Sequence, residues 1–62
     1  MKDPIAMYLE ILIETDLAYR VTNGGMAVWL PKSQIELLHH AGPGDGVEIT
    51  MPEWLAEEKG FI

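Results

Sequence analysis

The chain contains no cysteine and only four basic residues among its 62. Without cysteine, no disulfide can stabilise the fold and no thiolate can bind a metal ion. The scarcity of lysine and arginine argues against nucleic-acid binding, because basic contacts to phosphates supply most of the affinity of such proteins. No apolar run approaches the roughly 20 residues of a membrane-spanning helix, and the N-terminus lacks a signal-peptide pattern. We therefore expect a cytoplasmic protein that binds neither nucleic acid nor membrane.

Acidic residues dominate the charge that is present. Ten aspartates and glutamates give a net charge of −6, and 48% of the residues are hydrophobic, which is too many for a disordered chain. An acidic body is attracted to basic protein surfaces, including those that normally hold nucleic acid. The length predicts a single domain, 1–62, near the lower limit for folding alone. The sequence leaves monomer and homodimer open, because so small a core is marginal without a disulfide or a metal.

Glycine and proline divide the chain into short segments, a pattern typical of β structure. Asn23-Gly24-Gly25 predicts a tight hairpin turn between segments 17–22 and 26–30. The first segment places Leu17, Tyr19 and Val21 on one face. The second should end at Pro31, which cannot donate a hydrogen bond to a ladder.

Residues 5–14 fit a strand better than a helix. Every second residue from Ile5 to Ile13 is apolar, which predicts one buried face. The alternative is a helix with Asp3 as its cap and Pro4 at its first position. As an exposed edge strand, this segment could pair with a second copy of the chain.

The second half of the chain is less uniform. Residues 33–40 are open between a strand and a short helix capped by Ser33 and Glu36. The glycines at 42–46 predict a turn, and residues 47–51 alternate apolar and polar side chains like a half-buried strand.

The C-terminal residues predict the clearest helix. Thr50 and Glu53 have the spacing of a capping box, and Pro52 suits the first turn. Gly60 is placed to end the helix in a left-handed conformation. We expect Trp54, Leu55 and Phe61 to plug the open end of the core.

The predicted fold class is therefore mainly β with a short C-terminal helix, as a small curled antiparallel sheet or a partly open barrel.

No group of residues has the pattern of an active site. Adjacent His39 and His40 point in different directions on either a strand or a helix, so they are unsuited to joint metal binding. Glu10 and Glu14 would share a face, but so short a chain has little material for a sugar-binding cleft. Ser33 beside a lysine lacks the surroundings that activate a nucleophile. We predict a protein that is not an enzyme, with no catalytic residue, no metal site and no cofactor.

The acidic side chains are the remaining candidates for a binding site. They form two groups in the sequence, one near the end of the first predicted strand and one on the terminal helix. Acidic groups spaced like phosphates could occupy a basic groove of another protein. The predicted partner-binding residues are Glu10, Glu14, Asp16, Glu53, Glu57 and Glu58.

Two motifs, Trp29-Leu30-Pro31-Lys32-Ser33 and the ending Pro52-Glu53-Trp54-Leu55-Ala56-Glu57-Glu58-Lys59-Gly60, resemble a family of small uncharacterised domains of phages and prophages. The likeness covers most of the chain from residue 15 onward. It implies a compact β domain encoded by a mobile element and brings no catalytic residues. Short acidic proteins of that context include anti-CRISPR proteins, which bind the nucleic-acid or subunit surfaces of CRISPR effectors.

A second pattern joins Leu30-Pro31-Lys32, Ile35 and Leu38 to the segment 43–49 (PGDGVEI). It resembles swapped-hairpin transcription regulators and antitoxins. That resemblance implies an intertwined dimer that binds DNA through basic residues of the sheet, for which Arg20 and Lys32 are the candidates here.

The leading prediction is a mobile-element inhibitor whose acidic surface blocks a basic surface of a protein partner, such as a CRISPR effector. A dimeric DNA-binding regulator or antitoxin is the alternative, and an accessory domain of a phage replication protein is a third interpretation.

Overall fold

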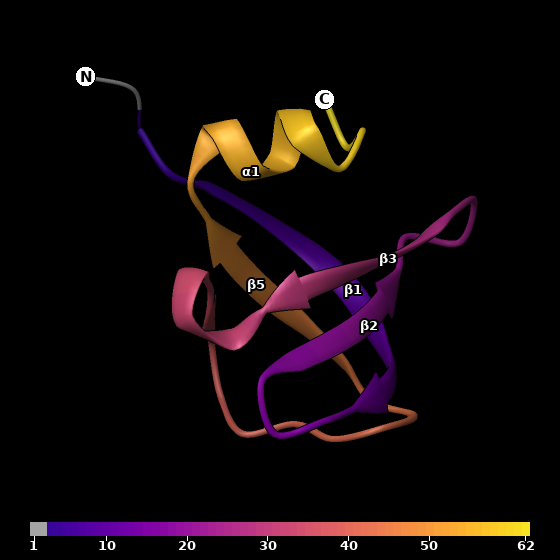
Figure 1. Cartoon of the computed structure of the whole chain (residues 1–62). Coiled ribbons are helices and arrows are strands. Elements are labelled where there is room, and N and C mark those ends of the chain that lie inside the picture. Colours follow the sequence, from indigo (N-terminus) through magenta and orange to yellow (C-terminus); the bar gives the residue numbers. More distant parts are fainter. Residues whose placement is uncertain (1–2) are drawn as a thin grey trace.

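The computed structural model describes residues 3–62 and consists of one antiparallel sheet and a short helix (Figure 1). The five strands lie in the order β3-β2-β1-β5-β4. Their bounds are Ile5–Glu14 (β1), Ala18–Thr22 (β2), Ala27–Pro31 (β3), Glu36–Leu37 (β4) and Gly46–Met51 (β5). A single 3-10 turn, η1, spans Lys32–Gln34, and the helix α1 spans Glu53–Glu58. No helix within this described part of the chain has the length and apolar character needed to cross a membrane.

The first strand is the centre of the sheet. Its N-terminal half pairs with β5 from Ile5 opposite Met51 onward, and its C-terminal half pairs with β2 from Glu10 opposite Thr22 onward. The strand interpretation of residues 5–14 is thus confirmed over the helix. The expectation that this segment is an edge strand is wrong, because β1 lies between β2 and β5 in the sheet.

A bulge interrupts β1 before its end. The pairing with β2 shifts between Ile11, which lies opposite Val21, and Ile13, which lies opposite Arg20. An extra residue in one strand exchanges the faces of all residues that follow it. Two expectations therefore fail. Ile13 lies on the outer face and is 48% exposed, and the shift puts Glu10 and Glu14 on opposite faces of the sheet.

The hairpin of β2 and β3 forms as the sequence predicts. Gly24 has a φ of +98°, a conformation that favours glycine. The side-chain oxygen of Asn23 accepts hydrogen bonds from the backbone N–H groups of Gly25 and Met26, at 2.9 and 3.0 Å. The strand β3 ends at Pro31, as expected. Leu17, which was expected in the first strand with Tyr19 and Val21, precedes β2 and is 80% exposed.

The segment 33–40 combines parts of both interpretations. It begins in η1 and continues as the two-residue strand β4, which pairs with β5. The capping role expected for Ser33 is wrong, since Pro31 is the residue at the N-cap and no side chain caps η1. The turn within 42–46 and the strand β5 are confirmed, with Val47, Ile49 and Met51 buried.

The N-cap of α1 lies two residues later than the sequence predicts. Thr50 still belongs to β5, where it pairs with Ala6 and Glu36, so Pro52 becomes the N-cap and the Thr50–Glu53 capping box does not form. The end of α1 agrees with the sequence. Gly60 has a φ of +86°, and its N–H donates to the carbonyl oxygen of Glu57 at 3.1 Å.

The same helix end brings the last residues back onto the core. The N–H of Phe61 donates to the carbonyl oxygen of Ala56 at 2.9 Å, which with the Gly60 bond completes a Schellman motif. Phe61 is half-buried and packs against the core, as expected.

The hydrophobic core lies between the inner face of the sheet and α1. From α1 it receives Leu55 and Ala56, which are 1% and 0% exposed. The prediction that Trp54 plugs the core is wrong, because its side chain is 52% exposed. Adjacent helical residues point about 100° apart, so burial of Leu55 directs Trp54 away. The remaining buried side chains come from the strands and one loop, and they are Leu9, Ile11, Val21, Leu30, Ala41, Val47, Ile49 and Met51.

The predicted fold class, mainly β with a short C-terminal helix, is confirmed. The sheet is open and neither closed nor strongly curled, with β3 and β4 as its two edges.

We predict that Gly60→Ala lowers the free energy of unfolding by about 1–2 kcal/mol, because an L-residue is strained in the left-handed conformation. A β-carbon at Gly60 would meet only the Met26 side chain, at an ordinary 3.5 Å, so the cost comes from the backbone. Urea denaturation followed by circular dichroism measures it. Gly42→Ala is the matched control, since no atom lies within 4 Å of its added carbon. Equal stability of the two variants would contradict the prediction.

Candidate functional site

The two acidic groups of the sequence lie at opposite ends of β1. The register that pairs Ile5 with Met51 brings the beginning of β1 next to the end of β5, from which α1 follows directly. Glu14 ends β1 at the far side of the sheet, and Asp16 follows it. Figure 1 shows α1 above one end of the sheet and the β1–β2 connection at the other. The structure therefore separates the residues on α1 from Glu14 and Asp16, and it places Glu10 in the middle of β1, on the opposite face of the sheet from Glu14.

The group on α1 faces outward in part. Glu57 and Glu58 are exposed, as expected, whereas Glu53 at the first helical position is half-buried. A glutamate in the first turn also interacts favourably with the positive end of the helix dipole. Glu57 and Glu58 are therefore the members of this group best placed to meet another molecule.

The group at the end of β1 includes an ion pair. The Nζ of Lys32 lies 2.8 Å from Oε2 of Glu14 and 4.8 Å from the centre of the Tyr19 ring. The carboxylate raises the pKa of Lys32 above its ordinary value of 10.5, chiefly through the hydrogen bond that Lys32 donates. Glu10 and Asp16 are exposed. Because the pair engages Glu14, Asp16 and Glu10 carry the accessible charge of this group.

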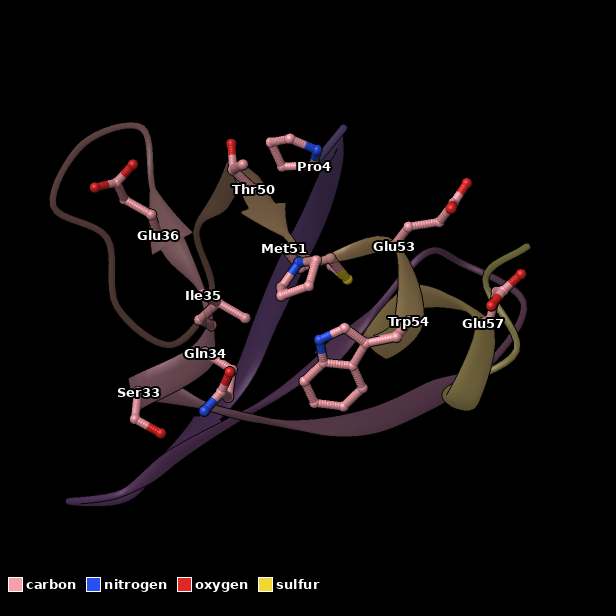
Figure 2. Close-up of a pocket in the computed structure, with 11 residues that line it drawn as sticks. Pro4, Ser33, Gln34, Ile35, Glu36, Thr50, Met51, Glu53, Trp54 and Glu57 are labelled. Atoms are coloured by element: carbon pink, nitrogen blue, oxygen red, sulfur yellow. The ribbon is translucent and has the colours of Figure 1, made fainter. Parts of the chain in front are cut away.

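A groove lies between η1, β4 and the beginning of α1. Its volume is about 700 Å³, and its lining combines apolar surface with carboxylates. Figure 2 shows the Trp54 indole and the Gln34 side chain pointing toward one another across it, below Met51. The carboxylates of Glu36, Glu53 and Glu57 point away from the middle of the groove, toward its rim.

The groove contains residues that the sequence did not single out as a site. Trp54 was expected in the core and Glu36 as part of a helix cap, and Gln34 had no assigned role. The sequence of a short helix does not show whether its tryptophan is exposed. The direction of the indole depends on which residue of the helix packs on the sheet, and here that residue is Leu55. Of the predicted binding residues, the groove gathers only Glu53 and Glu57.

The other candidates of the sequence do not converge. His39 and His40 are exposed, and the Nδ1 of His39 lies 3.1 Å from the carbonyl oxygen of His40. No group of three or more metal-binding side chains occurs within residues 3–62. Arg20 lies 5.7 Å from the centre of the Trp29 ring on the outer face of the sheet, where these two residues are directly opposite.

Comparisons of this chain with protein-family models, with curated proteins and with solved structures found no significant match. The likeness to phage domains and the weaker one to swapped-hairpin regulators therefore stay predictions from the motifs.

We predict that Glu14→Gln lowers the pKa of Lys32 toward 10.5, because the variant removes the charge that stabilises the ammonium group. Since the pKa is higher in the folded protein, the pair contributes stability below pH 10.5 and loses it as the pH rises through the folded-state value. An NMR titration of the Lys32 side chain gives the pKa. Glu10→Gln, on the opposite face, is the control and should leave it unchanged. A Lys32 pKa unaffected by Glu14→Gln would show that the pair is absent in solution.

Proposed function

We propose that this protein is a non-enzymatic binding module whose acidic surface blocks a basic surface of a protein partner. The observation that carries the proposal is the unequal exposure of its charges. Nine of the ten acidic residues are exposed, whereas Arg20, Lys32 and Lys59 are half-buried. A partner therefore meets a surface on which the exposed charges of residues 3–62 are acidic.

The size of the molecule suits this role. Its extents are 32 × 22 × 18 Å, and the two shorter ones are similar to the width of a nucleic-acid duplex. Negative charge at both ends of the long sheet could follow a groove that normally holds a phosphate backbone. The phage-domain motifs support a mobile-element origin, and CRISPR effectors are partners of that context with basic grooves. We therefore propose an anti-CRISPR-like inhibitor in the host cytoplasm.

Purified CRISPR effectors, each assembled with its guide RNA, provide the test by immobilised pull-down of the whole protein. We expect one effector to be retained, and retention to fall when NaCl is raised from about 0.1 M to about 1 M, since this shortens the Debye length from about 10 to 3 Å. Asp16→Lys and Glu58→Lys probe the two ends, and we expect at least one of them to weaken binding about fivefold, corresponding to about 1 kcal/mol.

The matched control is Glu48→Lys, which changes the net charge equally but lies on the outer face of β5, opposite Tyr8. If Asp16→Lys, Glu58→Lys and Glu48→Lys all weaken binding equally, binding depends on net charge alone. That result would count against a defined binding surface. No retention by any effector would contradict the CRISPR assignment. Salt-sensitive duplex binding by a dimer would overturn the whole proposal in favour of a DNA-binding regulator.

A further inference from the structure

We infer that the groove beside α1 binds an arginine side chain from an extended segment of the protein partner. This inference rests on the proposed function, because it names the group of a basic partner that one end of the acidic protein would recognise. Three features of the groove support it, namely an accessible indole, an apolar lining and carboxylates at the rim.

The indole of Trp54 is the first feature. It is 52% exposed and forms one wall of the groove (Figure 2). No cation from residues 3–62 lies over its ring, whereas Arg20 lies 5.7 Å from the centre of the Trp29 ring. Tryptophan is the aromatic side chain that attracts a cation most strongly, and a planar guanidinium can stack on it. The Trp54 ring is therefore available to an arginine from outside.

The apolar lining is the second feature. Ile35 and Pro52, which are half-buried, contribute accessible surface to it. Arginine has an apolar stem that gains free energy from such contact while its charged end stays hydrated or paired. The volume of about 700 Å³ holds one long side chain together with part of the segment that carries it.

The charge at the rim is the third feature and determines the chemistry of the occupant. Glu36 and Glu57 are exposed on opposite sides of the groove, one on β4 and the other on α1. Carboxylates on both sides favour a cation and disfavour phosphates and acidic peptides. Arginine is favoured over lysine, because its planar fork can stack on the indole and donate to a carboxylate at the same time.

NMR of the ¹⁵N-labelled full chain tests the inference. The probe is a short glycine–serine peptide with one central arginine, and its control carries citrulline, which has the same shape without the charge. We expect the arginine peptide to shift the indole N–H of Trp54 and the side-chain amide of Gln34 in a saturable manner, and to leave the indole of Trp29 unchanged. Trp29→Phe assigns the two indole signals. The citrulline peptide should bind about tenfold more weakly.

Variants of the groove separate its parts. Trp54→Ala should abolish the shifts of Gln34, and Trp54→Phe should retain part of the affinity because a smaller ring remains. Circular dichroism tests whether each variant is folded. We expect the Trp54 variants to fold, because the side chain of Trp54 is exposed. The double variant Glu36→Gln/Glu57→Gln should weaken binding about tenfold, and Glu48→Gln, outside the groove, should not change it.

Several results would overturn the inference. Equal binding of the citrulline peptide would show that charge is not recognised, and equal binding of a lysine peptide would exclude arginine specificity. Shifts confined to Trp29, or no shift at millimolar peptide, would place the partner elsewhere. Retention of an effector that depends on Asp16 but not on Trp54 would preserve the proposed function and remove the groove from it. Arginine binding without any effector retention would preserve the groove and remove the CRISPR partner.

Discussion

The burial of one face of β1 is the constraint on which the rest of the structure depends. This strand pairs with β5 over its first half and with β2 over its second half, and its residues Leu9 and Ile11 are at most 1% exposed at the centre of the core. In a chain of 62 residues, the elements that can cover it are few and short. The hairpin β2–β3, the strand β5 and the six-residue helix α1 are therefore all packed around the same small group of side chains.

That shortage of covering material explains the surface features of the molecule. A helix of six residues can direct only one side of itself onto the sheet. Leu55 and Ala56 occupy that side. Trp54 consequently points away from the sheet and lines the groove. On the opposite face of the sheet no helix covers the strands, so Trp29 is 38% exposed and contacts Arg20 instead of the core.

The same arrangement links the fold to the proposed function. The pairing of β1 with β5 fixes α1 at one end of the molecule, and the bulge after Ile11 fixes the geometry of Glu14 and Lys32 at the other. One end thus combines carboxylates with an apolar groove, whereas the other carries carboxylates beside an internal ion pair. Binding to a basic partner would use different chemistry at each end, with desolvation and stacking at the groove and longer-range attraction at the β1–β2 connection.

The sequence by itself determined four of the five strands, the hairpin turn and the end of the helix, because alternation of apolar residues and the positive φ of Gly24 and Gly60 are local properties. It also indicated which acidic residues could contact a partner, but it did not show which side chains lie beside each of them. Only the tertiary structure decided the bulge in β1, the exposure of Trp54 and the groove that joins Trp54 to Glu36. Each of these depends on register and on competition for one core between segments distant in the chain, such as β4 and α1, and no local pattern encodes that competition.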